Sequence, residues 1–395
     1  MLEWGGRRFR PIAPTTRVRN RQEAPIQRNR DNGVYLTGSF IQPNQQDGVA
    51  PPPPPAPTVS IAPSSAIQYE NVSLSASTTG TSPTFTWTLV DFYDTTDTPI
   101  TSYVGAVVPT GYFTTTGSSN VSVSMVCVEG TAVNSTFSVS EFAPSSISDM
   151  FAWIDFSDNS TITLRAGTDY IESITDKSGN WTLSQSNAAY QPLLLTGGSV
   201  DSTSTLQVAS FDGTSDSIYN SVSITPVAFT AHTSFSMGTM KYKSSAHPQG
   251  RSMMWEIGVN FPQDFTNRRC NNYVGQNQQI EGLQYAFATS YPYTDYYLTY
   301  TDYPLAYNIK TDSAVSATQT INGQAQSGFY TPTNSYWSPK DFTIGTQSNQ
   351  ITTSNSNKFF GEYWESIHYS RDLTADETTQ IDRYLQYKWL GTKQY

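Results

Sequence analysis

The sequence has few of the residues that build most catalytic and metal centres. Its 395 residues include two cysteines and three histidines, and only 14% are charged. Cys127 and Cys270 lie far apart in the chain, so they supply neither a disulfide framework nor a zinc ligand set, and we expect two buried thiols. His232, His247 and His368 follow no metalloprotease or triad spacing, and no phosphate-binding or dinucleotide glycine motif occurs. These absences argue against most common enzyme classes and predict no cofactor.

Long apolar runs are absent too. No stretch supplies the roughly 20 apolar residues of a membrane span, and the first residues carry arginines without an apolar segment. We therefore expect synthesis in a cytoplasm and no membrane contact. The abundance of Ser, Thr, Tyr, Gly and Pro instead predicts short strands and turns, a composition typical of proteins that work outside cells. A virion component, assembled in the host cytoplasm and exposed on the particle exterior, satisfies both expectations.

Charge is segregated along the chain. Residues 1–30 contain eight arginines and two glutamates (8 − 2 = +6), whereas the remainder has 22 − 8 = 14 basic and 32 − 2 = 30 acidic residues, or −16. Four prolines interrupt residues 1–50, so this segment predicts an extended arm that docks on another virion protein, such as the major capsid protein. Nucleic acid ranks lower as a partner because apolar side chains alternate with the arginines, and a merely soluble tail is the remaining alternative. The predicted docking residues are Trp4, Arg7, Arg8, Phe9, Arg10, Arg17, Arg19, Arg21, Arg28 and Arg30.

Residues 51–57 predict a polyproline spacer, and residues 58–143 a small β-sandwich. Apolar residues alternate in four segments, at Val72, Leu74 and Ala76, at Phe85, Trp87 and Leu89, at Val121, Val123 and Met125 or the offset pair Val126 and Val128, and at Phe137 and Val139. From PTVSIAPSS to TFSVS this segment resembles phage and bacterial immunoglobulin-like domains related to the polycystic-kidney-disease repeat. Leu74 stands where antibody domains carry their first cysteine. The resemblance implies a spacer domain.

Residues 150–395 predict a second domain with its clearest signals at the two ends. The segment 360–391 reads as a strand followed by a helix, with Thr374 as N-cap, Glu377 completing a capping box and Gly391 just past the end. The motifs WIDFSD, DKSGN, FDGTSDSI and GEYWESIHYSRDLTADETTQIDRYLQYKW resemble the concanavalin A-like (laminin G-like) jelly-roll family. That resemblance is weak over roughly 240–340, and it implies a two-sheet jelly roll that often binds carbohydrate and has no fixed activity.

Two sets of carboxylates are candidates for a functional role. Some enzymes of this fold carry Glu-x-Asp-x-Glu on one strand, but Glu256 is followed by Gly258 and Asn260, which leaves no second carboxylate for hydrolysis. The chain is therefore expected not to be an enzyme. Four aspartates in predicted turns suggest a calcium site, although capping of their own backbone is the favoured interpretation. They are Asp155, Asp158, Asp212 and Asp216.

The run of tyrosines at 285–307 offers the candidate recognition surface. Tyr291, Tyr293, Tyr297 and Tyr303 are the predicted glycan or subunit contacts, and packing in the core is the favoured alternative.

The sequence thus predicts an all-β chain with an N-terminal arm, an immunoglobulin-like sandwich and a jelly roll with a C-terminal helix. We expect a non-enzymatic capsid decoration (cement) protein or head fibre that forms a homo-oligomer. A tail, neck or fibre adsorption protein that binds host glycan is the first alternative, and a secreted lectin or glycan-active enzyme is the second.

Overall fold

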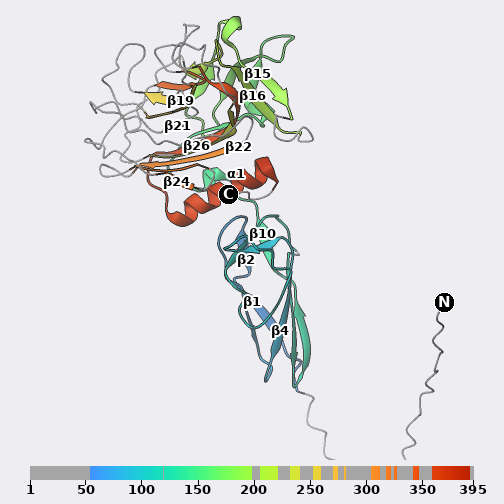
Figure 1. Cartoon of the computed structure of the whole chain (residues 1–395). Helices are drawn as coiled ribbons and strands as arrows, with labels where there is room; N and C mark the ends of the chain where they lie inside the picture. Colours follow the sequence, from blue (N-terminus) through green and yellow to red (C-terminus); the bar gives the residue numbers. More distant parts are fainter. Residues whose placement is uncertain are drawn as a thin grey trace, which may run out of the picture. The chain divides into compact units, whose positions relative to one another are not determined.

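The structure is a computed structural model. It describes residues 54–118, 120–197, 205–220, 232–240, 252–258, 270–274, 280–281, 304–311, 317–321, 324–326, 341–346 and 358–391. Between 252 and 326 only the backbone of the strands is described. Pro55–Tyr395 forms one compact unit, separate from Met1–Pro54. The chain is mostly β-strand with one C-terminal α-helix, which confirms the predicted all-β class (Figure 1).

The N-terminal sandwich, which we define as residues 57–143, contains ten short strands. They are β1 (Val59–Ala62), β2 (Ser65–Ile67), β3 (Ser75–Thr78), β4 (Thr84–Leu89), β5 (Phe92–Asp94), β6 (Ser102–Val104), β7 (Gly111–Phe113), β8 (Val121–Cys127), β9 (Gly130–Asn134) and β10 (Ser138–Ser140). The largest sheet has the order β6-β4-β8-β9, and the other strands form the antiparallel pairs β1-β3 and β5-β7 and the parallel pair β10-β2.

The alternation in the N-terminal sandwich places one face of each strand in the core. In β4 the burial pattern follows the predicted set, with Trp87 completely buried. In β8 the core takes the set that begins at Val121, whereas Val126 and Val128 are 57% and 80% exposed. Leu74 is completely buried in the same cluster. Cys127 is a free thiol but only half-buried, so the expectation of a buried thiol was wrong for this residue.

The C-terminal sandwich, residues 150–391, consists of two eight-stranded sheets. The first has the order β15-β16-β26-β18-β22-β23-β24, with β11 also paired to β26, and the second has the order β12-β13-β14-β17-β25-β19-β20-β21. The first sheet contains β11 (Met150–Asp155), β15 (Leu193–Thr196), β16 (Gln207–Asp212), β18 (His232–Met240), β22 (Pro304–Thr311), β23 (Ala317–Ile321), β24 (Gln324–Gln326) and β26 (Phe360–Tyr369). The second contains β12 (Ile162–Leu164), β13 (Ile171–Thr175), β14 (Thr182–Ser184), β17 (Ile218–Asn220), β19 (Ser252–Gly258), β20 (Cys270–Val274), β21 (Ile280–Glu281) and β25 (Asp341–Ile344). Three short 3-10 helices lie at Pro144–Ser146, Asn159–Thr161 and Ala188–Tyr190.

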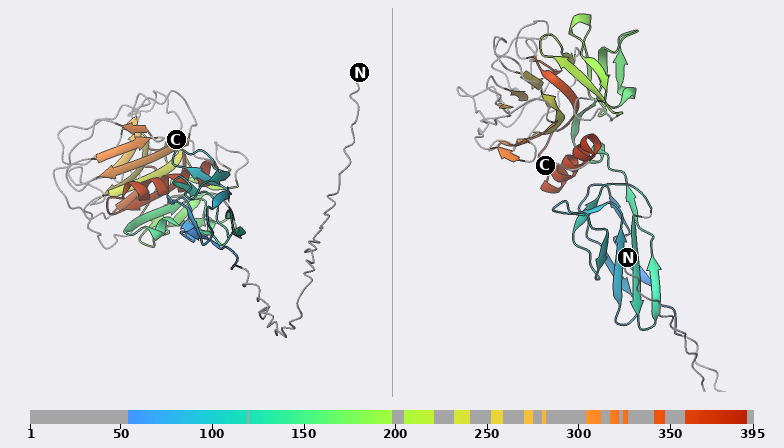
Figure 2. Two further views of the ribbon diagram at one scale, coloured as in Figure 1. Left: turned by 90° about the horizontal axis from the view of Figure 1, so that it is seen from below. Right: turned by 45° about the vertical axis from the view of Figure 1, so that its right-hand side comes forward.

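Helix α1 (Ala375–Leu390) covers the outer face of the β26 sheet (Figures 1 and 2). Thr374 and Glu377 form the predicted capping box, and Gly391 ends the helix in the left-handed conformation, with φ of 68°. Ile381, Leu385 and Trp389 recur at helical spacing and are buried against the sheet. Strand β26 is buried almost throughout, because α1 covers one face and the second sheet the other. No helix in the described part of the chain is long and apolar enough to cross a membrane.

Candidate functional site

Three of the four motifs named in the sequence, WIDFSD, DKSGN and the C-terminal strand–helix segment, meet at the joint between the two sandwiches and α1, whereas FDGTSDSI contributes no residue to it. Trp153 and Asp155 come from β11, Lys177 from the DKSGN turn, Glu365 from β26 and Lys388 from the last turn of α1. Residues more than 200 positions apart in the sequence therefore meet in one cluster. We refer to these side chains, together with Asp158, Tyr384 and Trp389, as the charged joint cluster.

The DKSGN turn is held by Asp176. Its carboxylate accepts the backbone N–H groups of Trp153, Ser178 and Asn180, which ties the turn to β11. Burial raises the pKa of this carboxyl against those hydrogen bonds. The turn directs the neighbouring Lys177 toward Asp155 and Asp158, at 3.2 and 3.0 Å.

Glu365 lies at the centre of the charged joint cluster and is completely buried. Its carboxylate accepts the indole N–H groups of Trp153 and Trp389, both at 2.7 Å. The Tyr384 hydroxyl donates to it at 3.0 Å, and Lys388 Nζ lies 2.7 Å away. Burial raises the pKa of Glu365, and the Lys388 charge opposes that rise. A carboxylate with four donors and no exposure is a structural anchor between strand and helix.

Asp155 links the two lysines. Lys388 Nζ lies 2.8 Å and Lys177 Nζ 3.2 Å from Asp155 Oδ2. Burial works to raise the pKa of Asp155, but the two ammonium charges outweigh it and the pKa is lowered. Asp158 has its pKa lowered to about 2, first by the hydrogen bond from Ser160 and then by Lys177. Both lysines of the cluster are thus already paired with carboxylates.

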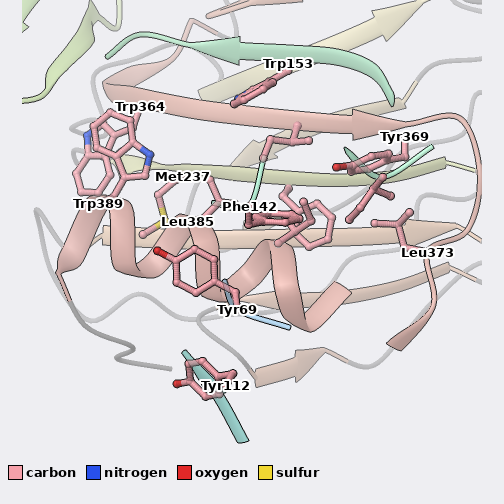
Figure 3. Packing of buried hydrophobic residues seen from close by; sticks show 14 of the residues in the cluster. Tyr69, Tyr112, Phe142, Trp153, Met237, Trp364, Tyr369, Leu373, Leu385 and Trp389 are labelled. Carbon is pink, nitrogen blue, oxygen red and sulfur yellow. The ribbon is translucent and has the colours of Figure 1, made fainter. Parts of the chain in front are cut away.

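The joint also carries an apolar cluster shared by both sandwiches (Figure 3). Tyr69, Tyr112 and Phe142 of the N-terminal sandwich belong to it, and Trp364 stacks on Trp389 at 5.3 Å between ring centres. The cluster also contains Ile147, Trp153, Val208, Phe235, Met237, Ile367, Tyr369, Leu373, Ile381 and Leu385. A shared core is evidence that the two sandwiches are fastened together rather than merely linked.

Arg383 of α1 fastens the helix to the N-terminal sandwich. Its guanidinium donates to the Tyr69 carbonyl at 3.1 Å and to Asn71 Oδ1 at 2.8 Å, and it lies 3.6 Å from the centre of the Tyr112 ring. Only 2% of the residue is exposed. The Tyr112 and Tyr387 hydroxyls lie 3.1 Å apart beside it.

A pocket of about 570 Å³ opens at the joint. Its wall includes Tyr69, Phe142, Trp153 and Tyr384 together with the turn that follows β11. Glu365 is not among the lining residues. The wall therefore combines aromatic side chains with the exposed polar residues of this turn, and of the four aromatics Tyr384 is partly exposed whereas Tyr69, Phe142 and Trp153 are buried.

The four candidate calcium aspartates do not gather in one site. Asp155 and Asp212 end strands rather than lying in turns, so that expectation was wrong for these two. Asp158 caps the 3-10 helix at Asn159–Thr161, and Asp212 accepts the backbone N–H groups of residues 214–216. Within the described residues no group of three or more His, Cys, Asp or Glu side chains is arranged to hold a metal ion. The favoured interpretation, capping of the local backbone, is confirmed for Asp158 and Asp212, and calcium binding stays the untested alternative.

The Asp212–Asp216 loop gives a testable pH dependence. Burial and the nearby Asp212 charge raise the pKa of Asp216 from 3.8 to about 7. The folded chain therefore keeps a proton that the unfolded chain releases, so this contribution to stability is complete below pH 4 and is lost as the pH rises through 7. Asp216→Asn should gain stability over the native chain from pH 4 to 8, by at most about 4 kcal/mol. Urea unfolding at pH 5 and pH 8 measures the difference in the free energy of unfolding between Asp216→Asn and the native chain. An equal difference at both pH values would refute the raised pKa of Asp216.

The structure does not describe most of the remaining candidate residues. The arm residues from Trp4 to Arg30 and the tyrosines Tyr291, Tyr293, Tyr297 and Tyr303 lie outside the described residues, as do His247 and the side chains of His232, Glu256 and Cys270. His368 is buried in β26, with its ring edge-on to Phe342, as expected of an ordinary strand residue. Glu365 and Arg383 were missed by sequence reasoning. A carboxylate between aromatic residues in YWESIHY is the signal that would have found Glu365.

No family model and no curated protein matches the chain. Among solved structures, a Trypanosoma rangeli sialidase is 13% identical, with 62% of this chain and 34% of that chain covered and a TM-score of 0.38. Domain 4 of an extracellular arabinanase from Geobacillus stearothermophilus, in complex with arabinotriose, is 13% identical over 59% of this chain and 97% of that one, with a TM-score of 0.37. The Ruminococcus gnavus IT-sialidase CBM40 is 12% identical over 38% and 82%, with a TM-score of 0.30. The chain spans about a third of the length of the sialidase. TM-scores this low carry no argument about function.

Proposed function

We propose that this chain is a non-enzymatic structural protein of a bacteriophage particle, a capsid decoration protein or head fibre. In this proposal the arm of residues 1–50 docks on the major capsid protein or another virion protein, and the folded unit is displayed outward. The observation that carries the proposal is the joint, where α1 binds both sandwiches through a shared core. A display component benefits from such a joint because it lets two small domains act as one body.

The carboxylates of the joint favour binding over catalysis. Glu365 is sealed by four donors, and Asp155 is held ionised between two lysines. Hydrolysis of a glycosidic bond needs one carboxyl group that donates a proton and a second that acts as nucleophile or base. Glu365 does not line the pocket, and Asp155, which does, is held ionised by the two lysines and is therefore a poor proton donor. This supports a structural or recognition role for the folded unit.

Adsorption to host glycan from the tail, neck or a fibre is the second candidate role. The pocket at the joint supports this role, because a concave surface lined by aromatic and polar side chains between two domains is the usual setting of a ligand site. The two roles share the same arm and the same folded unit. They differ in where the arm docks.

Deletion of residues 1–50 tests the anchoring step. The shortened chain should stay folded but be lost from gradient-purified particles of the phage that encodes it, because residues 1–30 of the arm carry the net charge of +6 that meets an acidic surface. A matched variant with all eight arginines replaced by lysine keeps the charge but loses bidentate contacts. It should join particles at intermediate occupancy and dissociate at lower salt. Normal occupancy of the shortened chain would place the anchor elsewhere and contradict the proposal.

A further inference from the structure

The pocket at the joint has the size and position of a ligand site. Its volume of about 570 Å³ falls within the roughly 300–1,000 Å³ usual for small-molecule sites, which occur preferentially between domains. Residues of the N-terminal sandwich, of β11 and its following turn, and of α1 all contribute to the wall. The site therefore exists only when the joint is assembled.

The charges of the wall do not favour an anionic ligand. The described part of the wall contains three carboxylates, Glu141, Asp155 and Asp158. It contains two ammonium groups, Lys177 and Lys388. Lys177 is paired with both aspartates, and Lys388 with Asp155 and Glu365. Among the described residues of this wall, no cation is left to neutralise a phosphate or a sugar carboxylate. The ligand that fits is neutral or carries a positive charge.

The rim offers small polar groups at close spacing. Ser157 and Ser160 donate to Asp155 and Asp158, which leaves their hydroxyl oxygens able to accept from a ligand. Asn159 lies exposed between them and its amide can both donate and accept. Each hydroxyl of a sugar is likewise both a donor and an acceptor. A polyhydroxyl ring therefore matches this rim better than a ligand with one strong charge does.

The aromatic side chains of the pocket wall are held in fixed positions. Tyr384 packs edge-on against Phe142 and Trp153, with ring centres 5.8 and 6.5 Å apart. The Tyr384 hydroxyl and the Trp153 indole N–H both donate to the buried Glu365 carboxylate, and these hydrogen bonds fix the orientation of the two rings. Phe142 and Trp153 are themselves buried, so it is the partly exposed Tyr384 ring, held by them, that gives the C–H face of a sugar ring an apolar surface at a reduced ordering cost.

We propose that this pocket binds one neutral sugar unit of a glycan. A sugar site here would supply the glycan contact of the second candidate role, adsorption to host glycan, and its biological purpose rests on that proposed role. The pocket recognises hydroxyl groups with the 157–160 turn and seats the ring against the partly exposed Tyr384.

Titration of the full-length chain with matched sugars tests the proposal. Glucose, galactose and N-acetylglucosamine are the neutral probes, and glucosamine and glucuronic acid carry the same type of ring with a positive or negative charge. Saturation-transfer NMR and calorimetry should show binding of at least one neutral probe and no binding of glucuronic acid. Asn159→Trp should abolish that binding by filling the exposed rim. Asn159→Ala should weaken it roughly tenfold, as expected for the loss of one or two hydrogen bonds.

Ala166→Trp is the control, since Ala166 is exposed in another turn of the same sandwich and does not line the pocket. It should bind like the native chain. The proposal is overturned if no neutral probe binds, if glucuronic acid binds more tightly than every neutral probe, or if Asn159→Trp leaves binding unchanged. Sugar binding is measured without particle assembly, so the two proposals can fail separately. A chain that binds no sugar can still need its arm to join particles, and a chain that binds sugar can still join particles without its arm.

Discussion

Replacing Glu365 with alanine is expected to lower the thermal unfolding midpoint of the full-length chain by roughly 10 °C. The change leaves the Lys388 ammonium, two indole N–H groups and the Tyr384 hydroxyl without their shared acceptor in the interior. Removing one partner of a buried ion pair typically costs about 3–5 kcal/mol. In a domain of this size each kcal/mol corresponds to a shift of about 2–4 °C.

Two variants separate this effect from the loss of any carboxylate. Glu365→Gln keeps one acceptor oxygen and should fall between alanine and the native chain. Glu172→Ala removes an exposed carboxylate from β13 of the same sandwich and should change stability by less than about 0.5 kcal/mol. Differential scanning calorimetry compares all three. If Glu365→Ala melts within about 2 °C of Glu172→Ala, Glu365 is not the anchor described above.

Local patterns were the part of the fold that the sequence could predict. The capping box at Thr374 and Glu377, the C-terminal Gly391 and the alternation at Phe85, Trp87 and Leu89 each depend on residues within a few positions of one another. Such signals do not require knowledge of the tertiary structure. They were confirmed at the level of single residues.

The joint could not be predicted in the same way. The partners of Arg383 lie 314 and 312 residues away, at Tyr69 and Asn71, and no periodicity connects them. The motifs WIDFSD and DKSGN were singled out, but their meeting with α1 depends on how β11 pairs with β26. The residues chosen for anchoring and for glycan contact lie outside the described part of the chain, so those choices stay predictions.

Replacing Arg383 with methionine is expected to loosen the joint. Methionine fills much of the space of the arginine stem but removes both hydrogen bonds to the N-terminal sandwich and the contact with the Tyr112 ring. The Tyr69 carbonyl and Asn71 then lose charge-assisted bonds, each worth about 1.5–3 kcal/mol. Arg383→Lys keeps the charge but lacks the planar guanidinium that donates two hydrogen bonds and stacks on the Tyr112 ring. It should therefore restore only part of the attachment between α1 and the N-terminal sandwich. Most of the lost free energy should appear as separation of the sandwiches rather than as unfolding of either one.

The measurement that tests the account most directly is the distance distribution between the two sandwiches. Spin labels at Val104→Cys and Thr163→Cys, both exposed, would be placed in a chain whose Cys127 and Cys270 are replaced by serine. Double electron–electron resonance should give a single narrow peak for this chain and a broad distribution once Arg383→Met is added. A broad distribution with Arg383 intact would contradict the claim that α1 fastens the two sandwiches into one displayed body.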